Sequence, residues 1–231
     1  MFEAFGQALI RSPLFQGIRN EDLSSLVKCL LPKRLDCRRG DYIIMAGDAL
    51  DSIGVVVTGK AAVIKEKVTG ERMVMTILEP GDLFGEMVAF AEEQPRWPAT
   101  VQAQDDSTVL FIPRERIAGT CGENCPWHQI LIRNMLRIVS ERALVLNQKV
   151  NYLSIKSLRR RICVFLLDHY KKKGQTTLKL PLNRNEMADF LSVARPALSR
   201  ELGRMREDGL IDYHLSTFRI LNIDALQRYA E

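Results

Sequence analysis

The chain has 231 residues, of which 46% are hydrophobic, and its net charge is +5 at pH 7. This length predicts one or two domains with packed cores, and the absence of any run of about 18 apolar residues argues against a membrane span. The N-terminus lacks a basic start followed by an apolar core, so we expect no signal peptide. Five cysteines without framework spacing are typical of a reducing cytoplasm.

The charge is distributed unevenly along the chain. Residues 156–231 carry 15 Lys and Arg against 9 Asp and Glu, a net charge of +6, whereas residues 1–155 carry 18 and 19, a net charge of −1. This asymmetry favours contact between the second part alone and a polyanion, with random scatter as the alternative.

The first part of the chain changes from helical to strand patterns. Residues 8–31 predict one helix or two short ones, because Glu21 and Asp22 suit a first turn and apolar residues then recur at helical spacing. From Pro32 to Ile112, short apolar segments are separated by glycine-containing turns. The predicted strands cover residues 41–45, 52–57, 61–67, 72–78, 99–103 and 107–112. Their spacing is typical of a compact antiparallel barrel or roll.

Residues 125–157 are predicted to form one long helix. Its apolar residues recur in steps of three and four over about three heptads, in a seam made of Leu136, Val139, Ala143, Leu146, Val150 and Leu153. This seam predicts the interface of a symmetric homodimer, and the alternative is a helix buried within one protomer. A second stripe is expected to pack on the roll and consists of Leu131, Met135, Ile138 and Val145.

The rest of the sequence predicts a second domain. A hinge near residues 154–158 precedes a helix over 158–170, a basic loop over 171–174 and a strand over 177–182. Two short helices follow, joined by a turn at Ser192 and Val193, and strands at 211–213 and 218–221 form a wing. The chain is thus predicted to be α+β. Its parts are a β-roll domain with an N-terminal helix (1–125), a dimerisation helix with a hinge (126–157) and a winged helix-turn-helix (158–231).

The two short helices carry clear local signals. Asn183 and Glu186 have the spacing of a capping box, Pro196 fits the first turn of the second helix, and Gly209 is expected to end that helix. The residues expected to face inward are Met187, Ala188, Phe190, Leu191, Ala197, Leu198, Leu202 and Met205. The residues left on the outer faces are Arg195, Ser199, Arg200 and Arg204. A short basic helix packed across a partner is the shape that enters a DNA major groove, and the alternative is a helical hairpin with solvated arginines.

A glycine-punctuated roll, a long helix and a winged helix-turn-helix, in this order, resemble the cyclic AMP receptor protein/fumarate-nitrate regulator (Crp/Fnr) superfamily of bacterial transcription factors. The resemblance covers nearly the whole chain, and its most specific segments are PGDLFGE (80–86), NQKVNYLSIKSLRRRI (147–162) and SVARPALSRELGRMREDGLI (192–211). It implies a cupin-like jelly roll of the cyclic-nucleotide-binding type. It also implies a homodimer in which a small-molecule effector, bound in the roll, positions two recognition helices on a palindromic operator.

The resemblance assigns DNA-binding roles to single residues. Family recognition helices carry an arginine, then a glutamate and, four residues later, another arginine; Arg195 and Arg200 match the arginines, and Pro196 replaces the glutamate. An arginine with two hydrogen bonds to guanine supplies about 1–3 kcal/mol of discrimination, whereas proline cannot accept from a cytosine amine. The half-site is therefore expected to differ from those of better-known members. Ser199 is a further candidate contact, and Arg184 resembles a phosphate anchor.

The resemblance also locates an effector site. Members that bind cyclic nucleotides use a Gly-Glu pair and an Arg-Ser pair, and Gly85, Glu86 and Arg96 match three of these positions, whereas Trp97 replaces the serine. We therefore expect an effector other than cyclic AMP, such as an organic anion held by Arg96 and stacked on Trp97. There are two alternatives. The effector is cyclic AMP itself, or Trp97 fills the pocket of the roll and the protein binds DNA without a ligand. A Thr-Ser pair that contacts adenine in the family is replaced by Leu146 and Asn147.

No metal or other cofactor is expected. The four-cysteine pattern of the family's iron–sulfur members is absent, although Cys121 and Cys125 keep a redox-sensing member open as an alternative, through a reversible disulfide. Cys163 is expected in the core, and His128 at the surface or as a helix cap. Residues 40–112 contain no histidine, which argues against a haem ligand in the roll and against the metal cluster of a cupin-like enzyme.

Three classes of function compete at this stage. The sequence favours a cytoplasmic homodimer that binds double-stranded DNA and a small-molecule effector, with RNA polymerase as a further partner if it activates transcription. An enzyme is disfavoured because no nucleophile–base arrangement or phosphate-binding loop is present. A module that controls a protein partner without touching DNA is disfavoured by the basic second part of the chain.

Overall fold

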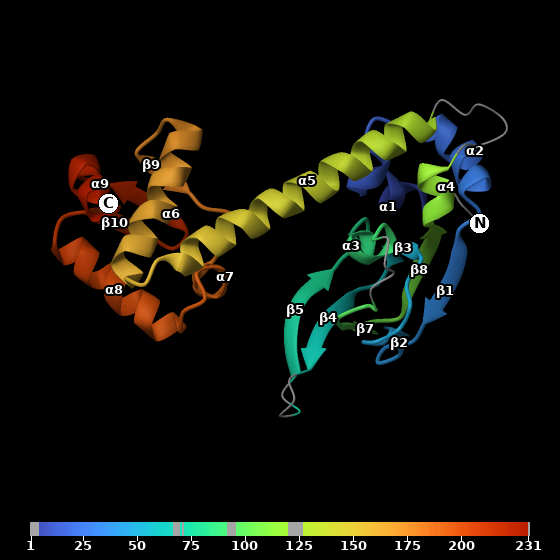
Figure 1. The fold of residues 1–231 in the computed structure, drawn as a ribbon, viewed down its shortest axis with the longest axis horizontal. Helices are drawn as coiled ribbons and strands as arrows, with labels where there is room; N and C mark the ends of the chain where they lie inside the picture. Colours follow the sequence, from blue (N-terminus) through green and yellow to red (C-terminus); the bar gives the residue numbers. More distant parts are fainter. Residues whose placement is uncertain (1–4, 67–69, 71, 92–95, 120–126, 231) are drawn as a thin grey trace. The chain divides into compact units, whose positions relative to one another are not determined.

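The computed structural model describes residues 5–66, 70, 72–91, 96–119 and 127–230, and Figure 1 labels its elements. The chain forms two compact units, Met1–Glu141 and Arg142–Glu231, which are described one at a time. Every helix in the described part of the chain is too short or too polar to cross a membrane.

The first unit is built on two four-stranded antiparallel sheets. One sheet has the order β1 (Lys33–Cys37), β8 (Ser107–Pro113), β3 (Ser52–Thr58) and β6 (Leu83–Phe84). The other has the order β2 (Tyr42–Ile44), β7 (Thr100–Ala103), β4 (Ala61–Glu66) and β5 (Arg72–Leu78). The predicted antiparallel roll is confirmed, and β1 and β6 are additions that the sequence patterns did not predict.

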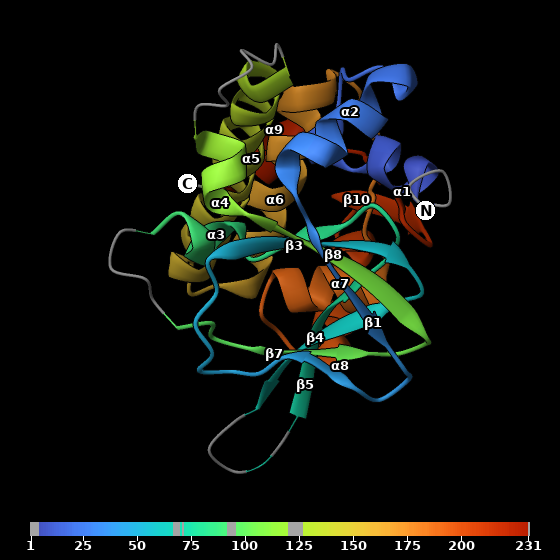
Figure 2. The same cartoon turned by 90° about the vertical axis from the view of Figure 1, so that its right-hand side faces the viewer.

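Short helices cover one sheet of the roll. They are α1 (Gly6–Arg11), the 3-10 helix η1 (Pro13–Phe15), α2 (Asn20–Leu30), α3 (Glu86–Ala89) and α4 (Arg114–Ala118). Figure 2 shows β3 and β8 between the N-terminal helices and the strands β4 and β7. Strand β3 is therefore buried on both faces: Ile53, Val55 and Val57 pack with the helices, whereas Val56 packs between the sheets.

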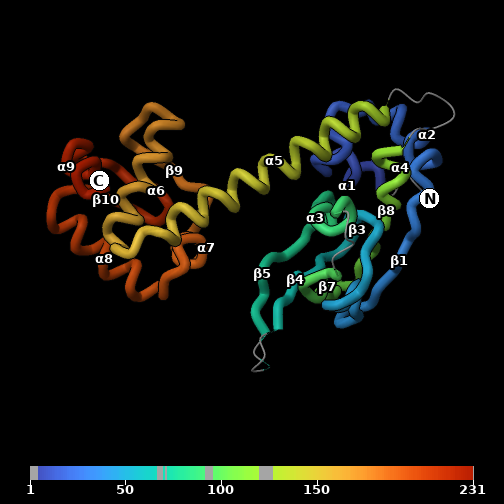
Figure 3. The backbone as a smooth tube through the Cα atoms, in the orientation of Figure 1, coloured from blue at the N-terminus to red at the C-terminus, as the bar shows by residue number. Residues whose placement is uncertain are grey.

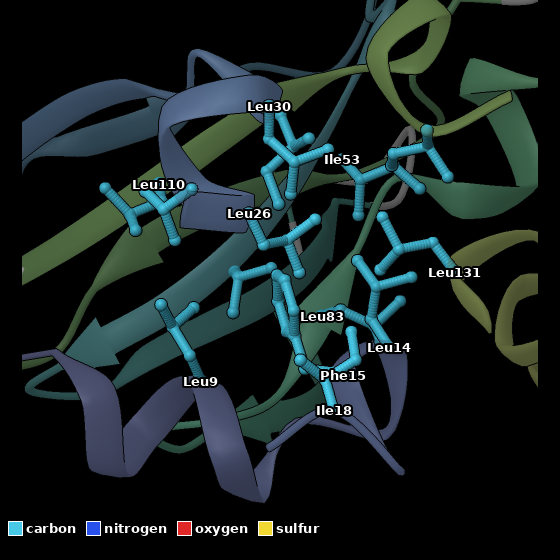
Figure 4. Packing of buried hydrophobic residues seen from close by; sticks show 14 of the residues in the cluster. Leu9, Leu14, Phe15, Ile18, Leu26, Leu30, Ile53, Leu83, Leu110 and Leu131 are labelled. Carbon is cyan, nitrogen blue, oxygen red and sulfur yellow. The ribbon is translucent and has the colours of Figure 1, made fainter. Parts of the chain in front are cut away.

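The core under the N-terminal helices draws on distant parts of the sequence. Leu9, Leu14 and Leu26 come from the helical segments and lie in one cluster with Leu110 of β8, as Figure 4 shows. Leu131 enters the same cluster from the long helix α5 (Trp127–Ser154). The long helix therefore begins as part of the roll domain.

The long helix α5 buries only its first turns in the roll domain. Leu131, Met135 and Ile138 are buried as predicted, and the amide of Asn134 donates to the carbonyl oxygens of Leu14 (2.9 Å) and Gln16 (2.8 Å). The predicted packing of Val145 on the roll is wrong, because this side chain is 53% exposed. The buried stripe stops at Ile138, and no residue of α5 is buried again before Tyr152.

The second unit combines the second half of α5 and four further helices with a three-stranded sheet of order β10-β11-β9. Its further elements are α6 (Leu158–Lys173), β9 (Thr177–Lys179), α7 (Arg184–Phe190), α8 (Arg195–Glu207), β10 (Ile211–His214), β11 (Thr217–Ile220) and α9 (Ile223–Ala230). The predicted helix-turn-helix and wing are confirmed, and Figure 3 shows α7 followed by α8 along the tube. The C-terminal helix α9 was not predicted.

Two predicted helix ends are wrong. Helix α5 ends at Ser154 rather than Ser157, and helix α6 continues through the three lysines that were predicted to form a loop. Lysine is a good helix former, and its positive charge is favourable at a helix C-terminus. Gly174 then ends α6 with a left-handed φ of 66°, and its N–H donates to the carbonyl oxygen of Tyr170 at 2.8 Å.

Candidate nucleic-acid interface and effector site

Helix α7 begins with the predicted capping box. The side-chain oxygen of Asn183 accepts from the N–H groups of Asn185 (2.9 Å) and Glu186 (3.0 Å), and the Glu186 carboxylate accepts from the N–H of Asn183 at 2.7 Å. These bonds satisfy N–H groups that a helix start leaves without partners. They fix where α7 begins and therefore where the following turn lies.

The turn between α7 and α8 is tight. Ser192 adopts a left-handed φ of 50°, and the N–H of Val193 donates to the carbonyl oxygen of Ala188 at 2.9 Å. Leu191 before the turn and Leu198 after it are both fully buried. Apolar packing on each side of the turn thus sets the angle at which α8 leaves α7.

Helix α8 divides into a buried and an exposed face, as predicted. Leu198, Leu202 and Met205 are completely buried, whereas Arg195, Ser199 and Arg200 are exposed, together with Pro196 and Arg204. Pro196 lies in the first turn, where its missing N–H breaks no helical bond. Arg195 and Arg200 form no ion pair with any described residue, so their guanidinium groups are available to guanine edges or phosphates.

The inner side of α8 is held by Arg159 of α6. Its guanidinium donates to Glu201 and to Asp208, both at 2.6 Å, and these bonds raise the pKa of Arg159 above its ordinary value. Glu201 is mostly buried and Arg159 is partly buried, so this pair is screened less than a surface pair. The second oxygen of the Glu201 carboxylate lies 3.6 Å from the guanidinium of Arg204, so Glu201 pairs with two arginines. Sequence patterns gave no sign of the Arg159–Glu201 pair, whose members are 42 residues apart.

Arg184 lies against the wing rather than projecting into solvent. Its guanidinium lies 4.9 Å from the ring centre of Tyr213 and 5.2 Å from that of Phe218, and it donates to the carbonyl oxygen of Leu215 at 3.3 Å. Burial lowers the pKa of Arg184, and the charges of Arg195 and Arg206 act in the same direction. The residue predicted as a phosphate anchor therefore also holds the wing beside α7.

The end of α5 is joined to the helix-turn-helix by two polar side chains that the sequence reading did not single out. Buried Tyr152 packs edge-on against Phe165 and Phe190, and its hydroxyl donates to Asp168 at 2.8 Å. Arg161 donates to the carbonyl oxygen of Ile155 through two nitrogens and to that of Leu191 at 2.6 Å through the third. A movement of the last turn of α5 would therefore act directly on the turn before α8.

Of the four roll residues predicted to bind an effector, Gly85 has a clear backbone role. It adopts a φ of 94° at the start of α3, and an added Cβ would lie 2.6 Å from a methyl group of Leu50. Glycine is the residue that tolerates both conditions. Glu86, the first residue of α3, is only 2% exposed, so the glycine turn carries a carboxylate into the interior.

Arg96 and Trp97 are held by the turn after β2. The N–H of Trp97 donates to the carbonyl oxygen of Asp48 at 2.9 Å, and Arg96 donates to that of Gly47 at 2.8 Å. The Arg96 side chain is exposed, whereas Trp97 is 5% exposed and lies 6.2 Å from the Phe84 ring in the core of the roll. The indole N–H of Trp97 has no hydrogen-bond partner within the described part of the chain.

The two predicted effector residues of α5, Leu146 and Asn147, belong to the second unit, and both are exposed. The predicted dimer seam is exposed along its whole length. It comprises Leu136, Val139, Ala143, Leu146, Val150 and Leu153. Within one chain these apolar side chains therefore leave a stripe open to a partner.

The cysteines and histidines do not assemble a metal site within the described residues. Cys121 and Cys125 lie outside those residues. His128 was predicted to lie at the surface or to cap the helix. The surface alternative is wrong, because His128 is 8% exposed and its Nε2 lies 3.3 Å from the sulfur of Cys29 in α2. Its packing partner is 99 residues away, which explains why local sequence did not place it. Cys163 is in the core, as predicted.

Comparisons with protein families agree with this geometry. The family model described as cyclic nucleotide-binding domain matches residues 34–124, and the one described as Crp-like helix-turn-helix domain matches residues 160–229. The first match covers the strands of the roll, and the second covers α6 to α9.

Curated relatives span most of the chain. The transcriptional activator protein FnrA of Stutzerimonas stutzeri is 26% identical over 190 residues, which are 80% of this chain and 75% of that protein. The cyclic AMP receptor protein of Thermus thermophilus is 25% identical over 219 residues, which are 95% of this chain and 97% of that protein. Both descriptions are those of regulatory proteins.

Solved structures share the fold. The catabolite activator protein of Thermus thermophilus aligns with a TM-score of 0.54 at 22% identity, covering 95% of this chain and 98% of that chain. A mutant of CooA from Carboxydothermus hydrogenoformans aligns with a TM-score of 0.55 at 18% identity, covering 90% of each chain.

Proposed function

Because the chain belongs to the Crp/Fnr superfamily of DNA-binding transcription regulators, we propose that it is an effector-responsive homodimer that reads a palindromic operator through α8. The observation that carries this proposal is the exposed face of α8. Arg195 and Arg200 stand on that face, while buried leucines hold the helix from behind. Such a helix, supported across α7, has the geometry of a major-groove reader.

The homodimer is supported by the exposed apolar seam of α5. A symmetric pair of protomers would bury this seam in a coiled coil. Each protomer then supplies one α8, and the half-sites lie about one helical turn of DNA apart. Two-fold symmetry of the protein predicts two-fold symmetry of the operator.

The half-site is proposed to depend on Arg195 and Arg200, with Ser199 as an additional contact. Pro196 has no acceptor for a cytosine amine, so the base opposite it is not read through a hydrogen bond. Arg184 is proposed to contact a phosphate without leaving the wing. Its guanidinium already donates to the carbonyl oxygen of Leu215 and packs on Tyr213, so only its remaining N–H groups can reach the DNA.

The effector is proposed to be a small organic anion other than cyclic AMP, bound near Gly85, Glu86, Arg96 and Trp97. Arg96 supports this proposal because its exposed guanidinium can pair with an anion. The buried indole N–H of Trp97 supports it because an acceptor on the ligand would satisfy this donor. Leu146 and Asn147 are proposed as further effector contacts on the resemblance to the family alone. RNA polymerase is a further partner if the protein activates transcription.

The test is a DNA-binding titration of the purified protein under anaerobic conditions. Operators are first selected from random duplexes, and the affinity of Arg200→Ala is then compared with that of the wild type. We expect a loss of about thirtyfold or more, because the variant loses one arginine–guanine pair in each half-site and each pair supplies about 1–3 kcal/mol. Arg228→Ala is the matched control, since it removes the same charge from an exposed position on α9.

The same titration separates the alternatives for the effector. A tenfold tightening by cyclic AMP, about 1.4 kcal/mol of coupling, would show that Glu86 and Arg96 still serve a cyclic nucleotide and would overturn the proposed ligand class. Unchanged affinity leads to a screen of organic anions in the same assay. Tight binding that no anion alters would identify a constitutive binder, and a change on oxidation would identify a redox sensor. Retained specific binding by Arg200→Ala would contradict the role of α8.

A further inference from the structure

A cysteine and a histidine meet where the long helix begins. The sulfur of Cys29, in the last turn of α2, lies 3.3 Å from Nε2 of His128, the second residue of α5. The two helices share one apolar cluster, to which Leu26 and Leu30 of α2 and Leu131 of α5 belong. The packing of these leucines therefore holds the sulfur and the imidazole within hydrogen-bonding distance.

Packing alone does not explain why the buried partner of Cys29 is a histidine. His128 is 8% exposed, and its Nδ1 has no hydrogen-bond partner among the residues that the structure describes. A buried ring nitrogen without a partner costs stability, so an apolar side chain of similar size would serve the core better. What histidine adds is a base in contact with a thiol, because its Nε2 can take the proton of Cys29.

Cys29 differs from the other cysteines that the structure describes, Cys37 and Cys163. Both of these are buried, and burial raises the pKa of each thiol. Cys29 is only partly buried, so a small reagent can reach its sulfur. This combination of access and a neighbouring base is typical of a reactive cysteine.

The helix ends near the sulfur act in opposite directions. The first turn of α5 is the positive end of a 28-residue helix and favours a thiolate, whereas the last turn of α2 is a negative end and disfavours it. An imidazolium in direct contact adds a full positive charge on the side of α5. The balance therefore favours a thiolate on Cys29 once His128 holds the proton.

We propose that Cys29 is a reactive thiol whose co-reactant is a hydroperoxide, with His128 as the acceptor and then the donor of the proton. The thiol proton passes to Nε2 of His128, and the sulfur attacks one oxygen of the peroxide. A sulfur–oxygen bond forms while the oxygen–oxygen bond breaks, so Cys29 is oxidised to a sulfenic acid and the peroxide is reduced. The departing oxygen takes the proton from His128 and leaves as water or an alcohol.

The histidine favours a peroxide over a disulfide as the co-reactant. A departing hydroxide or alkoxide is strongly basic and needs a proton, which His128 carries at that step. A departing thiolate is stable without a proton, so disulfide exchange would gain less from the histidine. The inference concerns the first unit alone and does not depend on DNA binding.

The full-length variant Cys121→Ser/Cys125→Ser tests the inference, because it limits the thiols to the three that the structure describes. The protein is treated with hydrogen peroxide, sulfenic acids are trapped with dimedone, and peptide mass spectrometry measures the rate of labelling at each cysteine. We expect Cys29 to be labelled at least about tenfold faster than Cys37 and Cys163. In urea this preference should disappear, because it depends on the folded pair.

The further change His128→Asn tests the role of the histidine. Asparagine keeps a polar side chain but cannot take the thiol proton, so the labelling of Cys29 should slow about tenfold or more. His169→Asn is the matched control, because it removes a histidine from the second unit, where its Nδ1 lies 2.9 Å from the carbonyl oxygen of Phe165. It should leave the rate at Cys29 unchanged.

The sign of the effect separates a chemical role of His128 from a structural one. If the histidine only packed α5 against α2, its loss would expose the sulfur and speed the labelling of Cys29. An unchanged or faster rate in His128→Asn would therefore overturn the inference. Labelling of Cys29 no faster than that of Cys163, or a preference that survives in urea, would overturn it as well. These last two comparisons need no change at His128, so they stay decisive if the His128 variant fails to fold.

Discussion

Cys163 shows how burial sets the chemistry of a single residue. Its side chain is completely buried in the core of the second unit, on the face of α6 that packs inward. Burial disfavours the charged thiolate and raises the pKa of Cys163 to about 11 from an ordinary value of 9.0. The thiol is therefore unreactive at neutral pH, and it gives the unit a dependence on alkaline pH.

The sign of that dependence follows from proton binding. Between pH 9 and 11 the unfolded chain loses the Cys163 proton while the folded unit keeps it, so the free energy of unfolding falls as the pH rises. At pH 10.5 the loss should be about 2 kcal/mol relative to pH 8. Urea unfolding of the wild type and of Cys163→Ala at both pH values measures it. An equal pH dependence in the two proteins would show that Cys163 does not contribute.

Single residues also mark the limit of what the sequence could predict. The exposure of Arg195, Ser199 and Arg200 followed from helical periodicity, because only local spacing is needed to find a helix face. The positions of His128 and Arg184 did not follow from it. Their partners are Cys29 and the aromatic rings of the wing, which only the folded chain brings to them.

At the scale of one element, the capping box determines how well α7 is fixed. Asn183→Ala removes the acceptor for two N–H groups, so we expect a loss of about 1 kcal/mol in the stability of the second unit. For a unit of this size the thermal midpoint should fall by about 4–8 °C, as calorimetry would measure.

Asn185→Ala is the control for this prediction. Asn185 is exposed in the first turn of the same helix, and it contributes its backbone N–H rather than its side chain to the cap. Its replacement should leave the midpoint almost unchanged. Equal losses in the two variants would mean that helix propensity, rather than the cap, determines the effect.

Elements differed in how clearly their sequence revealed them. Strands β3 and β8 are rich in β-branched and other apolar residues, and both were predicted within one residue at each end. Strand β1 was missed because four of its five residues are exposed and three are charged, so it shows no apolar alternation. Its strand state depends on pairing with β8, more than 70 residues away, in a register that joins Lys33 to Phe111.

At the scale of the whole molecule, the exposed seam of α5 predicts the state of assembly. We expect the wild type to sediment at twice its chain mass of 26.3 kDa, and Leu146→Glu combined with Val150→Glu to sediment as a monomer. Two like charges placed at facing core positions of a coiled coil lose their hydration and repel each other. Sedimentation velocity measures the difference directly.

Leu144→Glu is the control for the dimer prediction. Leu144 is as exposed as the seam residues, but its position in the heptad lies off the seam. This variant should remain a dimer and keep its affinity for the operator. A monomeric wild type, or a double variant that stays dimeric, would contradict the proposed assembly.

The hydrogen bonds donated by the three guanidinium nitrogens of Arg161 have a mechanical consequence. The short connection between α5 and α6 is held in place by the planar guanidinium of Arg161. Two of its nitrogens donate to the carbonyl oxygen of Ile155, and the third donates to that of Leu191. A rotation of the last turn of α5 is therefore transmitted to the turn before α8, because the backbone torsion angles of the connection are not free to change. The hydrogen bond from the Tyr152 hydroxyl to Asp168 connects the last turn of α5 to α6 as well, so two side chains stiffen this connection.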